Sequence, residues 1–484
     1  MSVTVKVSLQ SLNSALNVLR SVSLGLTTPS TQTVAMDQII VDKSGSVTIE
    51  AANWDTRQGV TLPGAIAGAT DGGPLAYGVP VNIRAWYKQM RTVCPKTIKG
   101  DAWAELTLTG NMHGGSVTLT TTQGSVAHDI GEKASYYLVP DPRNSRLGDE
   151  VAIARLTMGD VDLIDSVAVA AGSDPLKPQT HAVNLHRAGE LLRVYATDTF
   201  RVHRGTIDIG TEASVEVDIC PAVVPLRQGI TLLRKFDDGG DVRASYLPDM
   251  TDPRHGTLIL VTDAVRVNIP TLDMGGSPFD VRKASEAILD RRGPGSPVDW
   301  YPGVLLPVAD AMDAFDEASK IARGCGLNVT IDADASTLTF HFDDRDATEA
   351  DTRDWQYRYV CGGADLIGSG EVSAWQPQWL ADALAGVSDD CATISFSVAP
   401  NHGVMRYFTI QGSDFEAFIA GMKVSAAQVA EAPQVRQPQP EPAQPVKGVA
   451  PDRPTAGSPT GKARQSKSPM GRARATRKSK GRKP

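Results

Sequence analysis

Cysteine is scarce in this sequence and never forms a close pair. The 484-residue chain has five cysteines, with no Cys-x-x-Cys motif and an odd total. They are Cys94, Cys220, Cys325, Cys361 and Cys391. This spacing gives no support to a zinc knuckle or a disulfide framework and favours a reducing cytoplasm. We expect no metal ion and no cofactor.

Long apolar runs are also absent. No stretch approaches the ~20 residues that a helix needs to cross a bilayer, and MSVTVKVSLQ at the N-terminus lacks a basic region followed by an apolar core. The eight histidines are dispersed, and no Ser or Cys lies in a recognisable nucleophile turn. The sequence therefore predicts a soluble, cytoplasmic protein that has no membrane partner and is not an enzyme.

Three similar segments follow one another along the chain. At roughly 150 residues per domain, this length predicts about three domains. Amphipathic helices are predicted to begin at Ser8, near Gly159 and near Leu306, and hairpins follow at 39–55, 182–198 and 327–344. The apolar helix faces are Leu9, Leu12, Leu16 and Leu19; Val161, Ile164, Val167 and Ala168; and Ala309, Met312 and Phe315. The hairpins end on Asp55, Asp198 and Asp344.

A proline marks the predicted start of a second helix in each segment. Pro80, Pro221 and Pro377 suit a first helical turn, where the missing N–H has no partner to lose. The apolar faces that follow are Ile83, Tyr87 and Met90; Leu226, Ile230 and Leu233; and Leu380, Ala383 and Leu384. We therefore predict an α+β protein of three repeated domains, 1–146, 147–292 and 298–425, each with two helices packed on antiparallel sheet.

The C-terminal segment has a different composition. Residues 426–484 are rich in Pro and Gln and poor in large apolar residues, which predicts disorder. Residues 454–484 contain ten Lys or Arg and no Asp or Glu, which leaves a charge of −17 on residues 1–453. The basic run consists of Arg472, Arg474, Arg477, Lys478, Lys480, Arg482 and Lys483. Such a tail suits a polyanion such as nucleic acid, or serves only solubility.

Three motifs resemble one family. The segment YATDTFRVHRGTIDI is similar to the second-domain signature of the bacterial DNA polymerase III beta sliding clamp, in which an arginine follows Ala-Thr-Asp three residues later. TVAMDQIIVDKSGSVTIEAANWDTRQGVTL resembles the first-domain hairpin of that family, and FEAFIAGMKV resembles its closing strand. The three matches fall in the family's order along the chain, and the resemblance covers residues 1 to about 424. The resemblance implies a ring-forming homodimer in which two three-domain chains enclose duplex DNA.

The resemblance also implies partners and a peptide-binding groove. The ring would tether a replicative DNA polymerase near the nucleoid, and an ATP-dependent clamp loader would open it. The groove would be lined by Thr197, Arg201, Val202, Pro278, Phe418, Ala420 and Met422. Three positions depart from the family pattern: Phe200 replaces a small polar residue or histidine, Ala420 a methionine, and Gly421 a proline.

Basic residues on the second helices are expected to face DNA. Arg84, Lys88 and Arg91 share one helix face, and the next such helix carries Arg227, Arg234 and Lys235. A solvated helix face would have the same pattern. Acids on the first helices would repel phosphate, so we expect them on an outer rim away from DNA. They are Asp160, Asp162, Asp165, Asp310, Asp313, Asp316 and Glu317.

Two other functions stay open on the sequence alone. A clamp-like structural adaptor would keep the repeats without encircling DNA, and the acidic helices fit that alternative. A nucleic-acid-processing enzyme would use Asp198, His203 and the acids near residue 343. His341 with Asp343, Asp344 and Asp346 lacks the glycine and terminal glutamate of a calcium loop, and GSPTGK at 457–462 lacks the length and context of a phosphate loop.

Overall fold

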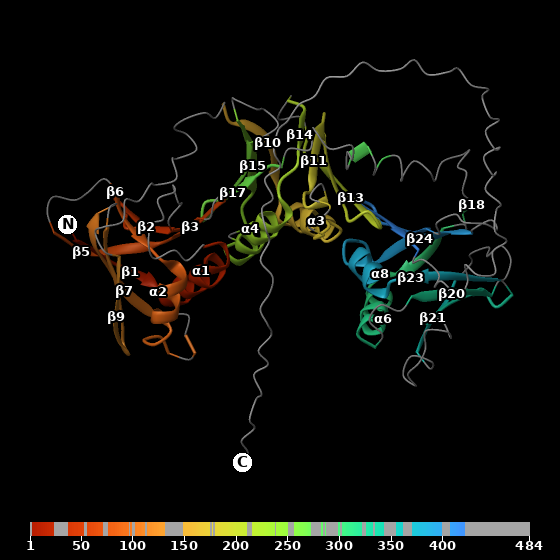
Figure 1. Ribbon diagram of the computed structural model, residues 1–484, viewed down its shortest axis with the longest axis horizontal. Helices are drawn as coiled ribbons and strands as arrows, with labels where there is room; N and C mark the ends of the chain where they lie inside the picture. The colour runs from red at the N-terminus through yellow and green to blue at the C-terminus, as the bar shows by residue number, and fades with distance from the viewer. Residues whose placement is uncertain are drawn as a thin grey trace, which may run out of the picture. The chain divides into compact units, whose positions relative to one another are not determined.

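A computed structural model (Figure 1) describes most of the chain between Ser2 and Gly421. The described residues are 2–23, 37–52, 56–70, 76–95, 97–98, 102–111, 114–130, 149–174, 177, 180–210, 215–237, 239–249, 256–272, 282–283, 286, 299–300, 303–321, 326–332, 334–342, 355–361, 370–398 and 407–421. Residues 1–425 form one compact unit. The predicted linkers at 139–146 and 291–297, Asp55, Asp344 and the predicted disordered tail lie outside the described residues.

One order of elements occurs three times, with β5 and β18 as additional strands. The first repeat has β1 (Ser2–Ser8), α1 (Leu9–Val22), β2 (Asp37–Asp42), β3 (Val47–Ala52), β4 (Arg57–Leu62), β5 (Gly64–Thr70), β6 (Ala76–Val81), α2 (Ile83–Met90), β7 (Trp103–Asn111), β8 (Gly114–Thr121) and β9 (Gly124–Ile130). The second has β10 (Val151–Leu156), α3 (Met158–Ala168), β11 (Asn184–Ala188), β12 (Leu191–Thr197), β13 (Arg201–Asp208), β14 (Val217–Ile219), α4 (Val223–Lys235), β15 (Val242–Pro248), β16 (Gly256–Val261) and β17 (Val265–Pro270).

The third repeat has β18 (Asp299–Trp300), β19 (Val304–Pro307), α6 (Val308–Ile321), β20 (Leu327–Asp332), β21 (Thr337–Phe342), β22 (Gln356–Val360), β23 (Gly370–Trp375), α8 (Pro377–Leu384), β24 (Cys391–Val398), β25 (Tyr407–Gln411) and β26 (Phe415–Ala420). Each predicted hairpin and helix is present. The predicted α+β class with three repeats is therefore confirmed.

Neighbouring repeats share their sheets. Among the described residues, one sheet runs β10-β15-β16-β17-β4-β3-β2-β6 and joins the first two repeats through β17 and β4. A second runs β14-β11-β12-β13-β26-β25-β24-β18 and joins the second and third repeats through β13 and β26. The other two sheets, β5-β1-β7-β8-β9 and β22-β21-β20-β23, belong to the first and third repeats alone.

The helices pack their apolar faces on these sheets as the 3.6-residue pattern predicts. Ser8 caps α1, with its hydroxyl accepting from the Ser11 amide, and Leu9, Leu12, Leu16 and Leu19 are buried. In α6 the prediction was wrong for Ala309, which is exposed, whereas the predicted Phe315 is buried and Met312 packs against the core. None of the helices in the described segments is long and apolar enough to span a membrane.

The prolines mark the second helices less sharply than predicted. Pro377 begins α8, but Pro80 lies in β6 opposite Gln38, and Pro221 forms a β-bridge with Thr271 two residues before α4. Pro80 is tolerated because β6 is an edge strand of its sheet. On the open side of an edge strand no hydrogen bond is lost when a residue has no backbone N–H. The prediction of a proline in the first helical turn was therefore wrong for α2 and α4.

A buried carboxylate anchors the start of α2. Asp37 accepts hydrogen bonds from the Ile83 amide at 3.0 Å, the Ala52 amide at 3.0 Å and the Ser23 hydroxyl at 2.5 Å. Burial raises the pKa of Asp37 to about 6, although the three hydrogen bonds lower it. The first repeat thus contains an acid that titrates close to physiological pH.

Candidate protein and DNA binding surfaces

The turn between β12 and β13 is held by Asp198. Its Oδ1 atom accepts from the amides of Phe200 at 2.9 Å and Arg201 at 3.0 Å, which is the geometry of an Asx turn. Thr199 has φ 82°, a left-handed conformation that is uncommon outside glycine. Asp198 therefore fixes the backbone of the Ala-Thr-Asp signature, and its carboxylate is fully engaged in that turn and with the Arg201 side chain.

Arg201 joins the second and third repeats. Its Nε donates to Asp198 Oδ2 at 3.0 Å, Nη2 donates to the Val169 carbonyl at 2.9 Å, and Nη1 donates to Asp382 Oδ2 at 2.6 Å. Asp382 lies on α8, and Val169 is the C-cap of α3. Because the guanidinium group is planar, these bonds fix the end of α3, the start of β13 and one face of α8 against one another.

Four apolar residues beside this arginine form a cluster separate from the main core. They are Val202, Tyr407, Phe418 and Ala420. Val202 lies opposite Phe418 in the β13–β26 register, and the Tyr407 and Phe418 rings are 4.5 Å apart. The structure thus brings three predicted groove residues together next to Arg201 and Thr197. Pro278 and Met422, which were also predicted for the groove, lie outside the described residues.

An aromatic pair lies beside Arg201, whose guanidinium carbon is 5.7 Å from the centre of the Trp379 ring. The Phe200 ring is 49 % exposed and stacks on Trp379 of α8, with 5.9 Å between ring centroids and 20° between planes. Lys177 Nζ lies 5.2 Å from the Phe200 ring and donates to the Thr199 hydroxyl. Tyr407 and Trp379 were missed by the sequence analysis, although Trp379 lies in the helix that was predicted after Pro377.

His203 has a structural environment. Its ring is fully buried, Nδ1 lies 3.2 Å from the Ser166 carbonyl, and the Phe415 ring packs edge-on at 5.2 Å. Burial, followed by the nearby Arg201 charge, lowers the pKa of His203 to about 3. The imidazole is therefore neutral at physiological pH.

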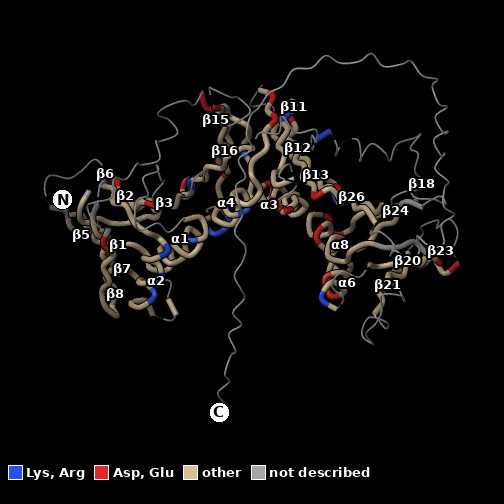
Figure 2. Tube along the Cα trace, in the orientation of Figure 1, with Lys and Arg blue, Asp and Glu red and all other residues tan. Residues whose placement is uncertain are grey.

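A basic surface covers α2 and the end of α1 (Figure 2). Arg84, Lys88 and Arg91 are exposed on one face of α2, and with Arg20, Ser21 and Tyr87 they line a hollow of about 820 Å³. Arg84 Nε donates to the Arg20 carbonyl, and the Arg20 guanidinium lies over the Tyr87 ring at 4.7 Å. No carboxylate in the described segments forms an ion pair with these four cations. Arg20 of α1 thus lies with the basic residues that were predicted on α2, and the sequence analysis did not predict its place there.

The arginines of α4 have a different environment. Arg227 Nε lies 2.9 Å from Asp165 Oδ1, and Arg234 contacts Asp162 at 2.6 Å and Asp165 at 2.7 Å. Burial lowers the pKa of Arg234, but the hydrogen bonds that Arg234 donates to Asp162 and Asp165 outweigh burial and leave the pKa raised. Asp162 and Asp165 therefore lie beside these arginines, because α3 packs against α4 and aligns opposite charges.

Other predicted acids have local roles. Asp160 forms a capping box with Thr157 at the start of α3, and Asp316 forms an ion pair with Lys320 one turn later on α6. Asp310, Asp313 and Glu317 are exposed on α6. The described segments contain no group of three His, Cys, Asp or Glu that could hold a metal ion. Asp343, Asp344, Asp346 and the basic tail lie outside the described residues.

Solved structures share this arrangement of repeats. The beta subunit of Streptococcus pyogenes DNA polymerase matches with a TM-score of 0.58 and 13% identity, over 87% of this chain and all of that one. The sliding clamps of Pseudomonas aeruginosa and Bacillus subtilis match with TM-scores of 0.61 and 0.60, at 11% and 13% identity, over 88% of this chain and 100% of each of theirs.

The chain has the fold of a DNA polymerase III beta sliding clamp. The family resemblance predicted from the three motifs is confirmed at the level of fold. No family model matches the sequence, which agrees with identities this low. Within the clamp fold, the Arg201 turn and the Val202 cluster lie where the second and third repeats meet, and the basic surface belongs to the helices of the first.

Proposed function

We propose that this protein is a DNA sliding clamp: a homodimeric ring that encircles duplex DNA and tethers a replicative DNA polymerase. The ring would be opened by a clamp loader and would act in the cytoplasm at the nucleoid, without catalysing a reaction itself. Encirclement replaces repeated rebinding by a tethered encounter at high effective concentration. The protein would then stay on DNA mainly because the ring is closed around the duplex, and less through contacts with particular base sequences.

The sheet edges carry this proposal. Within the chain, β17 pairs with β4 and β26 pairs with β13. The threefold order makes β9, β17 and β26 equivalent, and likewise β4, β13 and β22. Among the described residues, β9 and β22 are the two members of these sets that lack such a partner. If β9 of each copy pairs with β22 of the other copy, the same kind of junction forms twice. Two chains then close into a ring of six repeats.

The electrostatics support contact with DNA on the helix side of the first repeat. Arg20, Arg84, Lys88 and Arg91 are free of described carboxylates, so each is available to a phosphate. Sequence-independent phosphate contacts position a protein without fixing its register, as sliding requires. Arg227, Arg234 and Lys235 are the weaker part of this proposed surface, because Asp162 and Asp165 neutralise the two arginines.

The cluster around Val202 and Phe418, with Thr197, Arg201 and Ala420, is the proposed peptide groove. A beta clamp of Helicobacter pylori with this fold has been solved with a DNA ligase peptide, and its 12% identity limits that comparison to the fold. Aliphatic and aromatic anchors at such a junction suit a short hydrophobic peptide of a polymerase or loader. Phe200 and Trp379 would contact the peptide at the rim.

Retention on closed DNA tests the proposal. Purified protein loaded onto a nicked circular plasmid is separated by gel filtration before and after the plasmid is cut once. We expect a dimer by solution mass, retention on the circle and release from cut DNA. Equal release from both forms, or a monomer at all concentrations, would contradict encirclement.

One observation favours a second candidate, a clamp-like adaptor that does not encircle DNA. The ion pairs between α3 and α4 leave little free positive charge on α4, and the α6 surface is acidic. An adaptor would form the dimer and bind peptide yet show no difference between circular and cut plasmid.

A further inference from the structure

Four side chains form a stack next to the proposed peptide groove. Lys177 Nζ lies 5.2 Å from the centre of the Phe200 ring, and the Phe200 ring stacks on Trp379. The guanidinium carbon of Arg201 lies 5.7 Å from the centre of the Trp379 ring. The Phe200 carbonyl accepts a hydrogen bond from the Ala420 amide at 2.7 Å. The stack is therefore adjacent to the apolar cluster of the groove, to which Ala420 belongs.

The two cations of this stack differ in how their charge is compensated. Arg201 forms ion pairs with the carboxylates of Asp198 and Asp382. Lys177 Nζ donates to the Thr199 hydroxyl at 3.0 Å, and it forms no ion pair with a carboxylate in the described part of the chain. Because an ammonium group has three N–H donors, Lys177 keeps donors for a ligand.

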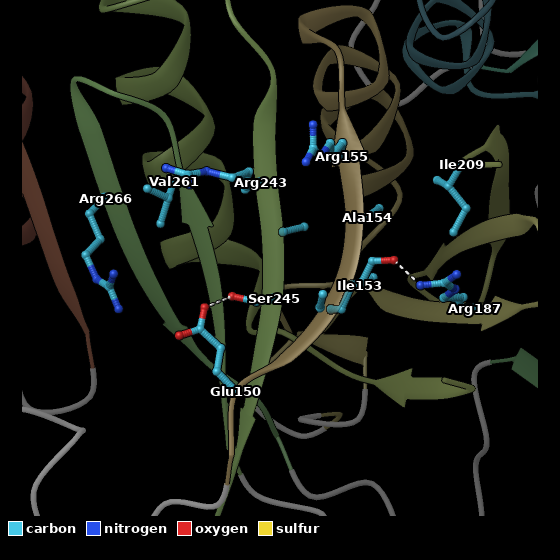
Figure 3. Close-up of a pocket in the computed structure, with 12 residues that line it drawn as sticks. Glu150, Ile153, Ala154, Arg155, Arg187, Ile209, Arg243, Ser245, Val261 and Arg266 are labelled. Atoms are coloured by element: carbon cyan, nitrogen blue, oxygen red, sulfur yellow. Dashed lines mark hydrogen bonds between the residues drawn. The ribbon is translucent and has the colours of Figure 1, made fainter. Parts of the chain in front are cut away.

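A buried cation of the same repeat shows the contrast. Arg187 of β11 lines a cavity of about 470 Å³ beside β10, and its guanidinium donates to the Ile153 carbonyl of β10 (Figure 3). Its side chain is 1 % exposed, so this arginine serves the fold. Lys177 is partly exposed, and the hydrogen bond that it donates to Thr199 lies at the surface. The ammonium group of Lys177 is therefore within reach of a partner.

Lys177 is held in place before any ligand binds. Its ammonium group is fixed by the Thr199 hydroxyl and by the face of the Phe200 ring, a cation–π contact. An exposed ion pair usually contributes little, because two flexible side chains must lose their freedom to form it. Since these contacts already restrict Lys177, its pairing with a ligand carboxylate would lose less entropy.

We propose that Lys177 makes the groove select hydrophobic peptides that carry an acidic residue beside their apolar anchor. This inference rests on the proposed function, since it names the class of peptide that the groove takes. The anchor would occupy the apolar cluster, the neighbouring residue would contact Phe200, which is 49 % exposed, and its carboxylate would pair with Lys177. Asp198 and Asp382 would repel this carboxylate little, because Arg201 pairs with both.

Titration of the full chain with two versions of one peptide tests the proposal. A labelled hydrophobic peptide from a polymerase C-terminus is made with Glu at both residues that flank its anchor, and in a second version with Gln at both. We expect the unaltered protein to bind the Glu version about three- to fivefold more tightly, which is the upper range for an exposed ion pair. Added salt should reduce this preference, because it screens the two charges.

Substitutions of Lys177 assign the preference to one side chain. Lys177→Gln should bind the Glu and Gln versions equally, and Lys177→Arg should keep the preference because it keeps the charge. Lys177→Glu should bind a version with Lys at the flanking residues more tightly than the Glu version, and this binding also shows that the variant is folded. The matched control is Lys43→Gln, which removes an exposed lysine from the β2–β3 turn and should keep the full preference.

The outcomes separate this proposal from the proposed function. If the unaltered protein binds the Glu and Gln versions equally, the groove stands and the role of Lys177 is overturned. The same conclusion follows if Lys43→Gln loses the preference as Lys177→Gln does. If neither version binds, the groove itself is wrong and the selection by Lys177 fails with it.

Discussion

Arg201 Nη1 on β13 lies 2.6 Å from Asp382 Oδ2 on α8, so one ion pair joins residues 181 positions apart in the chain. The side chains are only 10% and 20% exposed. Partial burial makes the pair harder to break than a surface pair, because each ion would lose its partner in a poorly solvated place. The signature arginine thus contributes to the junction of two repeats as well as to the proposed groove.

Arg201→Ala should destabilise the protein strongly. We expect a loss of about 3 kcal/mol, because Asp198 and Asp382 both lose their partner. Urea unfolding measures it. Lys320→Gln removes an exposed ion pair within α6 and should leave the urea midpoint unchanged. Equal effects of the two substitutions would contradict the assigned role of Arg201.

Asp37 should make stability depend on pH. Its pKa is about 6 when folded and 3.8 when unfolded, so the folded state binds the proton more tightly. The stabilisation that comes from protonated Asp37 is fully present below pH ~4. It is lost as the pH rises through about 6, and the free energy of unfolding then falls by about 3 kcal/mol. In Asp37→Asn, the free energy of unfolding measured in urea should change less between pH 4 and 7.5 than it does in the unaltered protein. Asp42→Asn is the control, because hydrogen bonds from Ser44 lower the pKa of Asp42 and its effect appears only at lower pH.

The two basic helices should differ in DNA binding. Arg84→Gln/Lys88→Gln/Arg91→Gln should reduce the slope of log affinity against log salt by up to about 2.7, at about 0.9 per lost phosphate contact. Arg227→Gln/Arg234→Gln should change it little, because Asp162 and Asp165 already neutralise these arginines. Fluorescence anisotropy of a labelled duplex measures both. A larger effect from the α4 pair would refute the assignment of the α2 surface.

Charge exchange should reveal the dimer edges. Asp129 on β9 and Arg358 on β22 are both exposed, and Arg204 with Glu416 already forms an ion pair across the β13–β26 junction. Asp129→Arg or Arg358→Asp alone should weaken the dimer, and the double variant should restore it. Sedimentation equilibrium measures the dissociation constant. Additive losses in the double variant would argue against the β9–β22 contact.

Phe200→Ala should weaken peptide binding with little effect on folding. Removal of an exposed aromatic anchor typically costs about 1–2 kcal/mol of binding energy, or roughly tenfold in affinity. Titration with a labelled hydrophobic peptide from a polymerase C-terminus measures this. Val224→Ala removes another exposed hydrophobic residue, 64% exposed on α4, and should change nothing. An unchanged affinity in Phe200→Ala would place the peptide elsewhere.

The sequence by itself determined the periodic features of this protein. Local hydrogen bonding and apolar spacing act over a few residues, so α1, its Ser8 cap, the three hairpins and the threefold order could be read directly. The fold family followed from the resemblance of the motif around Arg201 to a known signature. Its partner Asp382 could not be predicted, because no local rule connects β13 to α8.

Only the tertiary structure decided which charges remain free. The stripes on α2 and α4 look alike as sequence, yet packing of α3 against α4 pairs Asp162 and Asp165 with Arg227 and Arg234. Ion pairing depends on distances of a few ångströms between segments far apart in the chain, and folding alone sets those distances.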